Sequence, residues 1–97
     1  MNIKRMNRDK LPIGLREPFR ELRGRGTNGN ATVFGNNQGF LPTAGRGNTY
    51  YEYDVGEDRA GGRGRFRLVA LVSGGGKLLA AYFTSAHYMG EWTEITW

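Results

Sequence analysis

Residues 49–55 read TYYEYDV, and this stretch decides the fold. Successive side chains of a strand point to opposite faces of its sheet. One face would therefore carry Tyr51 and Tyr53, and the opposite face would carry Glu52 and Asp54. The pattern predicts a strand with an aromatic side turned towards a core and an acidic side turned away from it.

Four further strands are expected around this stretch. The segment 63–72 becomes apolar towards its end, and SGGGK at 73–77 has the glycines of a hairpin connection to a partner strand at 78–84. A short strand is expected at 31–34, and a last alternating strand at 91–97. The sequence shows no internal repeat.

One helical pattern precedes these strands, within residues 7–25. Leu15, Phe19 and Leu22 recur at i, i+4 and i+7, which is the apolar stripe of an amphipathic helix. Pro18 fits a first turn better than a helix interior, so we expect the helix to begin just before it or to be broken there. One helix followed by four or five antiparallel strands is an α+β arrangement.

The chain has 97 residues, enough for one domain with a modest core. We expect a basic helical region at 1–30 and an antiparallel sheet at 31–97. No apolar run reaches the roughly 20 residues that a membrane helix needs. The first ten residues lack the apolar stretch of a signal peptide. The sequence therefore predicts neither a membrane partner nor a visible targeting segment.

The chain has no cysteine and a single histidine, His87. The absence of cysteine excludes disulfides, cysteine-ligated zinc sites and thiol catalysis. A metal site would depend on one histidine and carboxylates, so we expect no metal and no other cofactor.

Positive charge is concentrated near the N-terminus. The formal net charge is +5, and residues 1–27, with eight basic and three acidic side chains, account for all of it. Eleven of the fourteen basic residues are arginine, whose guanidinium group suits phosphate. A solvated basic helix and a surface that attracts a polyanion such as nucleic acid both fit this pattern.

Three features of the sheet region could act together on a phosphate ester. Glu52 is either a solvated residue or a placed base. Arg63, Arg65 and Arg67 share one face of their strand, either as a screened stripe or as a clamp for an anion. His87 follows an apolar strand and is either structural or a proton donor near neutral pH.

Together these side chains would be sufficient to cleave RNA without a metal. A carboxylate can take the proton of the 2′-hydroxyl, and arginines can stabilise the charge that builds on the phosphoryl group. A histidine can protonate the leaving 5′-oxygen. The nucleophile belongs to the substrate, so the protein does not have to supply one.

Residues 31–97 resemble the small guanyl-preferring bacterial ribonucleases of the barnase, binase and streptomycete type. Five blocks occur in the order and near the spacing of that family. They are Thr32-Val33-Phe34, Leu41-Pro42-Thr43, Tyr50-Tyr51-Glu52-Tyr53, Arg63-x-x-x-Arg67 and Thr84-x-x-His87-Tyr88. The resemblance implies an α+β fold in which a helix packs on one face of a four- to five-stranded antiparallel sheet and RNA binds the other face.

The resemblance also implies the roles of the charged residues. Glu52 would be the general base and His87 the general acid. Arg63 and Arg67 would hold the scissile phosphate, with Arg65 beside them among the substrate contacts. The family forms a 2′,3′-cyclic phosphate and hydrolyses it slowly to a 3′-phosphate.

The same resemblance points to the residues that would contact the base. Tyr88 would line the site, Phe34 would lie under the base, and Asn36 would contribute from the recognition loop. That loop usually ends in Arg-Glu, but here Asn37 and Gln38 stand in those places. A glutamine side chain offers one acceptor and one donor, so it cannot accept both hydrogen bonds that guanine donates to the family carboxylate. A weaker or altered guanine preference is therefore predicted.

The leading hypothesis is an endoribonuclease, either secreted or delivered into the cytoplasm of a target cell as part of a larger toxin. RNA would be its substrate, an acidic barstar-like inhibitor or immunity protein its partner, and the chain would be a monomer. A non-catalytic basic RNA-binding module is the alternative, but it does not explain Glu52 and His87 in matching blocks. A structural domain without a site would leave the clustered charges unexplained.

Overall fold

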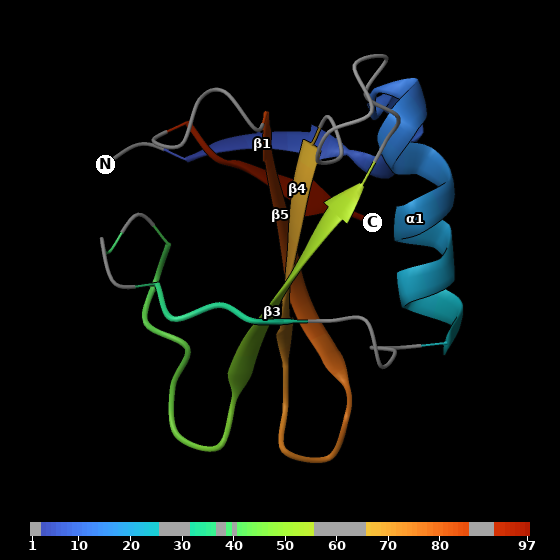
Figure 1. The fold of residues 1–97 in the computed structure, drawn as a ribbon. Coiled ribbons are helices and arrows are strands. Elements are labelled where there is room, and N and C mark those ends of the chain that lie inside the picture. The colour runs from blue at the N-terminus through green and yellow to red at the C-terminus, as the bar shows by residue number, and fades with distance from the viewer. Residues whose placement is uncertain (1–2, 26–31, 37–38, 40, 56–65, 86–90) are drawn as a thin grey trace.

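One α-helix packs against a six-stranded sheet (Figure 1). The computed structural model describes residues 3–25, 32–36, 39, 41–55, 66–85 and 91–97, without the side chains at 25 and 54. The described elements are β1 (Lys4–Asn7), the 3-10 helix η1 (Arg8–Lys10), α1 (Ile13–Arg25), β2 (Thr32–Val33), β3 (Thr49–Val55), β4 (Phe66–Val72), β5 (Leu78–Ser85) and β6 (Thr93–Thr96). Neither described helix combines the length and the apolar character needed to cross a bilayer.

The strands are ordered β1-β6-β5-β4-β3-β2. Neighbours from β2 to β6 are antiparallel, whereas β1 runs parallel to β6. The α+β class is confirmed, but the expected sheet of four or five antiparallel strands is in fact a mixed sheet of six. The additional strand is β1, in which three of four residues are exposed, so no alternation marks it in the sequence. It is held at the sheet edge by its pairing with β6, which includes an ion pair between Arg5 and Glu94 at 3.0 Å.

The other strands lie where the periodicity placed them. β3 has the expected bounds, and β5 extends one residue further than expected. β2 and β6 are shorter than the expected segments, and β4 contains every described residue of its expected segment. Residues 31 and 63–65 of those segments lie outside the described residues.

Helix α1 begins at Ile13, so the expected start or break at Pro18 is wrong. A proline in a helix interior removes one hydrogen bond and costs about 3 kcal/mol. The apolar stripe of Leu15, Phe19 and Leu22 is at most 5% exposed. Burying one such side chain contributes about 1.5–3 kcal/mol. Burial of the stripe therefore outweighs the proline, and the helix continues through it.

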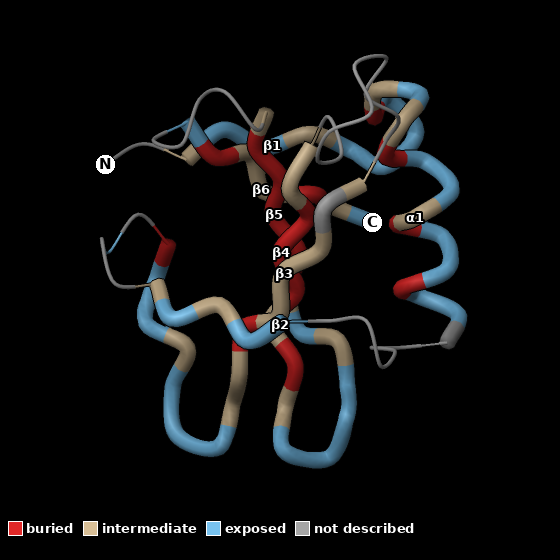
Figure 2. The backbone as a smooth tube through the Cα atoms, viewed as in Figure 1, coloured by how far each residue is buried: buried red, intermediate tan, exposed pale blue. Residues whose placement is uncertain are grey.

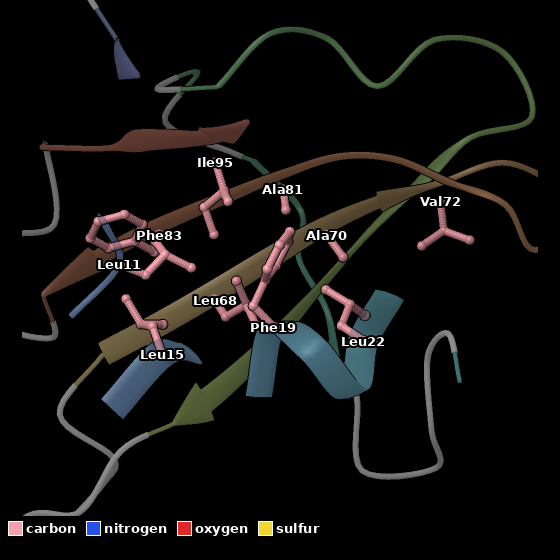
Figure 3. Packing of buried hydrophobic residues seen from close by; sticks show 10 residues of the cluster. All are labelled: Leu11, Leu15, Phe19, Leu22, Leu68, Ala70, Val72, Ala81, Phe83 and Ile95. Atoms are coloured by element: carbon pink, nitrogen blue, oxygen red, sulfur yellow. The ribbon is translucent and has the colours of Figure 1, made fainter. Parts of the chain in front are cut away.

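The main core lies between α1 and the sheet (Figure 3). Leu15, Phe19 and Leu22 point from the helix towards β4, where Leu68 is buried between them and the sheet. Tyr51, on the aromatic side of β3, packs against this cluster. The face of β3 that the alternation assigned to the core is therefore confirmed.

A second hydrophobic cluster covers the opposite face of the sheet. Its buried members are Leu41, Tyr50, Val69, Tyr82 and Trp92. Loops rather than a helix lie over this face, and much of the loop that precedes β3 is exposed (Figure 2). Side chains beside the cluster can therefore be approached from solvent, which is what a site for a polymer requires.

The hairpin predicted at residues 73–77 joins β4 to β5. The N–H of Ser73 donates to the carbonyl of Lys77 at 2.9 Å, and the N–H of Gly76 donates to the carbonyl of Ser73 at 2.9 Å. Gly76 has φ 89°, a conformation that favours glycine. Gly76 therefore serves the turn.

Candidate active site

Glu52 lies in the interior of the sheet, on the face turned away from α1. It pairs with Thr32 of β2 on one side and with Val69 of β4 on the other. Its side chain is half-buried, and the alternation of β3 places it on the same face as the buried Tyr50. A strand paired on both sides holds a carboxylate in a fixed position, as proton transfer requires.

Arg67 of β4 shares this face with Glu52. Its cross-strand partners are Asp54 and Thr84, and it stands two positions along β4 from Val69, the partner of Glu52. Diagonal neighbours of this kind are about 7–8 Å apart, within reach of long side chains. The side chain of Arg67 is half-buried and its Nε atom is enclosed by protein. Part of the guanidinium group is therefore enclosed by protein, on the face of the sheet that also carries Glu52.

A hollow of about 400 Å³ opens on the side of β3 where the preceding loop crosses it. Its lining is formed by Phe34, Gly35, Asn36, Thr43, Ala44, Asn48, Thr49 and Tyr50. Two residues that the sequence assigned to the base, Phe34 and Asn36, are thus brought together in one place. The volume is in the range of small-ligand sites.

Phe34 forms an aromatic wall of this hollow. Its ring contacts Tyr50 and Trp92 edge-on, with centroid separations of 6.2 and 5.7 Å. Its backbone N–H donates to the carbonyl of Tyr50 at 2.9 Å, which fixes the start of the loop to β3. The ring is therefore held in place by packing from two sides.

The side chain of Asn36 forms hydrogen bonds within its own loop. Its Nδ2 donates to the carbonyl of Leu41 at 2.9 Å, and its Oδ1 accepts from the N–H of Leu41 at 3.1 Å. Its φ of 51° lies in the left-handed region, which asparagine tolerates better than most residues. The backbone carbonyl of Asn36 accepts a further hydrogen bond from the N–H of Gly39 at 3.0 Å. Asn36 is therefore the residue that shapes the loop.

Tyr50 is a residue of the site that sequence reasoning missed. Its hydroxyl donates to the carbonyl of Pro42 at 2.7 Å, which ties the loop to β3 a second time. Burial, followed by the neighbouring Tyr82, raises the pKa of Tyr50 above its ordinary value. The signal was present in the alternation, because Tyr50 shares the face of Glu52.

Thr84, near the end of β5, is a second missed residue. Its hydroxyl donates to the backbone carbonyl of Glu91. This bond joins the two ends of the chain segment that contains His87 and Tyr88. Thr84 is only 2% exposed, so the connection is made inside the protein.

Four of the ten residues named from the sequence are therefore placed, namely Phe34, Asn36, Glu52 and Arg67. The other six lie outside the described residues, and they are Asn37, Gln38, Arg63, Arg65, His87 and Tyr88. Within the described part of the chain, no group of three carboxylate or imidazole side chains could hold a metal ion.

A family model of ribonucleases matches residues 4–93. The chain belongs to this ribonuclease family. The match includes β1 and ends at the first residue of β6, so it covers the helix and the strands β1 to β5 in full. This ribonuclease is an endoribonuclease, and the face that carries Glu52 and Arg67 is its candidate catalytic face.

Solved structures of ribonuclease Sa2 are similar to this ribonuclease. One, of complexes with mononucleotides, has a TM-score of 0.73 at 27% identity and covers 99% of this chain and 96% of that one. A structure with guanosine-2′-cyclophosphate has a TM-score of 0.69 at 26% identity, covering 98% and 97%. A structure with 3′-GMP has a TM-score of 0.66 at 26% identity, covering 97% of each chain. No curated protein matches the chain.

Proposed function

We propose that this endoribonuclease cleaves single-stranded RNA by transesterification without a metal. The O2′ atom of the substrate forms a bond to phosphorus, the bond from phosphorus to O5′ breaks, and a 2′,3′-cyclic phosphate is left. Water then hydrolyses the cyclic ester to a 3′-phosphate. The observation that carries this proposal is the placement of Glu52 and Arg67 on one open face, beside the hollow that holds Phe34.

Glu52 is the general base in this proposal. Its carboxylate takes the proton of the 2′-hydroxyl as O2′ attacks. The side chain is half-buried on a strand that is paired on both sides, so it is already oriented when the substrate binds. In the second step it returns the proton, because the hydrolysis of the cyclic ester reverses the first step.

Positive side chains stabilise the charge on the phosphoryl group. Arg67 is half-buried on the face of the sheet that carries Glu52, and Arg63 lies four residues before it in the sequence. Guanidinium groups donate paired hydrogen bonds to phosphate oxygens and remain charged at any working pH. His87 is proposed as the acid that protonates O5′, with Arg65 and Tyr88 as further substrate contacts. These last assignments depend on the family resemblance.

The hollow beside β3 is proposed as the base site. Phe34 offers a fixed aromatic wall, and the loop held by Asn36 offers backbone groups along its edge. Ribonuclease Sa2 has been solved with guanine nucleotides, which supports a purine at the corresponding place. Asn37 and Gln38 replace the family's Arg-Glu, so we propose that the guanine preference is relaxed.

The biological setting is proposed from the same resemblance. We propose a monomeric nuclease that is secreted or delivered as a toxin domain into the cytoplasm of a target cell. An acidic barstar-like inhibitor or immunity protein would protect the producing cell, and the net charge of +5 supports an acidic partner.

The test is cleavage of a synthetic mixed-sequence RNA in the presence of EDTA, with mapping of the cut sites. Products with 2′,3′-cyclic ends are expected, and the base on the 5′ side of each cut reports the preference. Loss of all cleavage in EDTA, with recovery on addition of a divalent cation, would overturn the metal-independent mechanism.

A further inference from the structure

A second hollow lies at α1, on the other side of the sheet from Glu52. Its volume is about 460 Å³, and it opens between η1 and the helix. The described residues that line it are Arg8, Asp9, Arg16, Phe19, Arg20 and Arg23. Because Phe19 belongs to the core between α1 and the sheet, this hollow is separate from the catalytic face. The outer surface of α1 is exposed along most of its length (Figure 2).

The charge of this hollow is strongly positive, because four arginines line it with a single aspartate. The acidic partners of these arginines bind them loosely. Arg8 Nε is 3.9 Å from Asp9, and Arg20 is 3.4 Å from Glu17, with both members of the second pair more than two-thirds exposed. Ion pairs this exposed contribute little, so water or another anion can replace them. The hollow is therefore suited to an incoming anion.

One of these guanidinium groups is held in place by the backbone. The Nε of Arg16 donates to the carbonyl of Leu11 at 2.8 Å, which fixes the group against the start of the helix. Arg20 and Arg23 project from the same helix at a spacing of three residues, which places them on neighbouring parts of one face. Arg8 faces them from η1. Forked donors from two elements match the tetrahedral oxygens of a phosphate.

An exposed aromatic ring completes the surface. Trp97 is 44% exposed, and its ring packs on Phe19 with a centroid separation of 5.6 Å. The guanidinium carbon of Arg23 lies 5.4 Å from the centre of the Trp97 ring. Arginines beside an exposed aromatic ring are the combination that proteins use for single-stranded nucleic acid, since the ring stacks a base and the arginines hold the backbone.

We propose that this hollow is a second RNA contact, in which a phosphate of the RNA chain binds the arginines and an unpaired base stacks on Trp97. It would hold a part of the substrate remote from the cleaved bond, so only RNA long enough to pass around the sheet would use it. A single-stranded RNA fits this surface better than an acidic protein does. Carboxylates could pair with the arginines, but they would not explain the exposed ring of Trp97. The inference rests on the proposed action on single-stranded RNA.

The first test measures binding to an RNA that cannot be cleaved. A fluorescent 20-nucleotide RNA with 2′-O-methyl groups lacks the attacking hydroxyl, so its anisotropy reports affinity whichever residues are catalytic. The variant is Arg20→Gln/Arg23→Gln, and the matched control is Lys4→Gln/Lys77→Gln, which removes equal charge from exposed positions elsewhere. We expect about tenfold weaker binding at low salt than for the control. The slope of log affinity against log salt should fall by about 0.7 for each phosphate that the variant no longer neutralises.

The second test separates this contact from the catalytic face. The Arg20→Gln/Arg23→Gln variant should cleave a dinucleoside phosphate with unchanged kcat/KM and should cleave the long RNA with a raised KM. Arg8→Gln, from the opposite wall, should raise the KM for the long RNA independently. A loss equal to that of the lysine control, or an equal loss on the dinucleoside phosphate, would overturn the inference. If the unmodified enzyme cleaved neither substrate, the proposed mechanism would fail while the binding test still decided on the second RNA site.

Discussion

The side-chain amide of Asn36 and the backbone of Leu41 exchange two hydrogen bonds, of 2.9 and 3.1 Å. One side chain thus reproduces the pairing that a neighbouring strand would give to the loop. The exchange fixes the mouth of the hollow in which Phe34 stands, before any nucleotide arrives. Rigidity of this kind lowers the entropic cost of ordering a loop when a ligand binds.

Replacing Asn36 should separate the contribution of its side-chain hydrogen bonds from that of its tolerance for a left-handed backbone. Asn36→Ala loses the side-chain amide and its hydrogen bonds to Leu41. It also leaves alanine at φ 51°, in the left-handed region, so the protein should be destabilised by about 2–3 kcal/mol. Asn36→Gly loses the amide but accepts the φ, and should cost about 1 kcal/mol less. Urea unfolding measures both. Equal losses of stability would show that the backbone conformation contributes nothing.

Glu52→Gln should remove the proposed base while keeping the size of the side chain. We expect kcat to fall by about 10²–10⁴-fold with little change in the melting temperature. The control is Glu94→Gln, on the same face but two strands beyond β4 and paired with Arg5. A similar loss in both variants would contradict a special role for Glu52.

Gln38→Glu should restore the carboxylate that the guanyl-preferring family uses. Two acceptor oxygens can take both hydrogen bonds from guanine, whereas an amide offers one acceptor. We expect the ratio of kcat/KM for guanine over adenine substrates to rise about tenfold, which is a gain of about 1.4 kcal/mol in discrimination. Cleavage of matched dinucleoside phosphates measures the ratio. An unchanged ratio would mean that Gln38 does not face the base.

Thr84→Val should act on catalysis without touching the substrate. Valine keeps the shape of the side chain but leaves the carbonyl of Glu91 without the hydroxyl, at a cost of about 1–3 kcal/mol. Because this bond joins the ends of the segment with His87, we expect kcat to fall more than KM rises. Thr84→Ser keeps the hydroxyl and should restore kcat. A serine variant as slow as the valine variant would contradict this positioning role.

Tyr50 gives a prediction at alkaline pH. Burial raises its pKa in the folded protein above the value of about 10 in the unfolded chain. Its contribution is therefore complete below pH 10 and is lost as pH rises, by about 1.4 kcal/mol per pH unit. Tyr50→Phe loses the bond to Pro42, about 1 kcal/mol, but no longer titrates. The free energies of unfolding of the two proteins should therefore converge between pH 10 and 11; parallel curves would contradict the raised pKa.

Periodicity predicted the parts of the fold that depend on burial. The alternation around Glu52 gave β3 its bounds and its two faces, and the stripe of Leu15 and Phe19 identified the buried side of α1. The edge strand β1 was not predicted, because an edge strand needs no apolar face. The start of α1 was predicted wrongly, because the helix propensity of Pro18 is a local effect. Tertiary burial overrides such local terms.

The residues of the candidate site are predicted in a different way. Residue type and strand alternation point to Glu52 and Arg67, and the register of β3 and β4 places both on one face of the sheet. The roles of Asn36 and Thr84 in holding their loops could not be seen in the sequence, because each acts through a bond to a backbone carbonyl five or more residues away. Backbone acceptors carry no side-chain signature, so only the folded chain shows them.

The pairing of β1 with β6 determines how far the enzyme can fold while it is being synthesised. Arg5 and Glu94 are 89 positions apart, yet they lie side by side in the sheet. Contacts between such distant segments form late, since a long loop must close first. While the chain is still being synthesised, β1 has no neighbour, and the sheet cannot be completed before residue 96 has left the ribosome. A nascent nuclease of this topology would thus remain incompletely folded in the producing cell until β6 has been synthesised and has paired with β1.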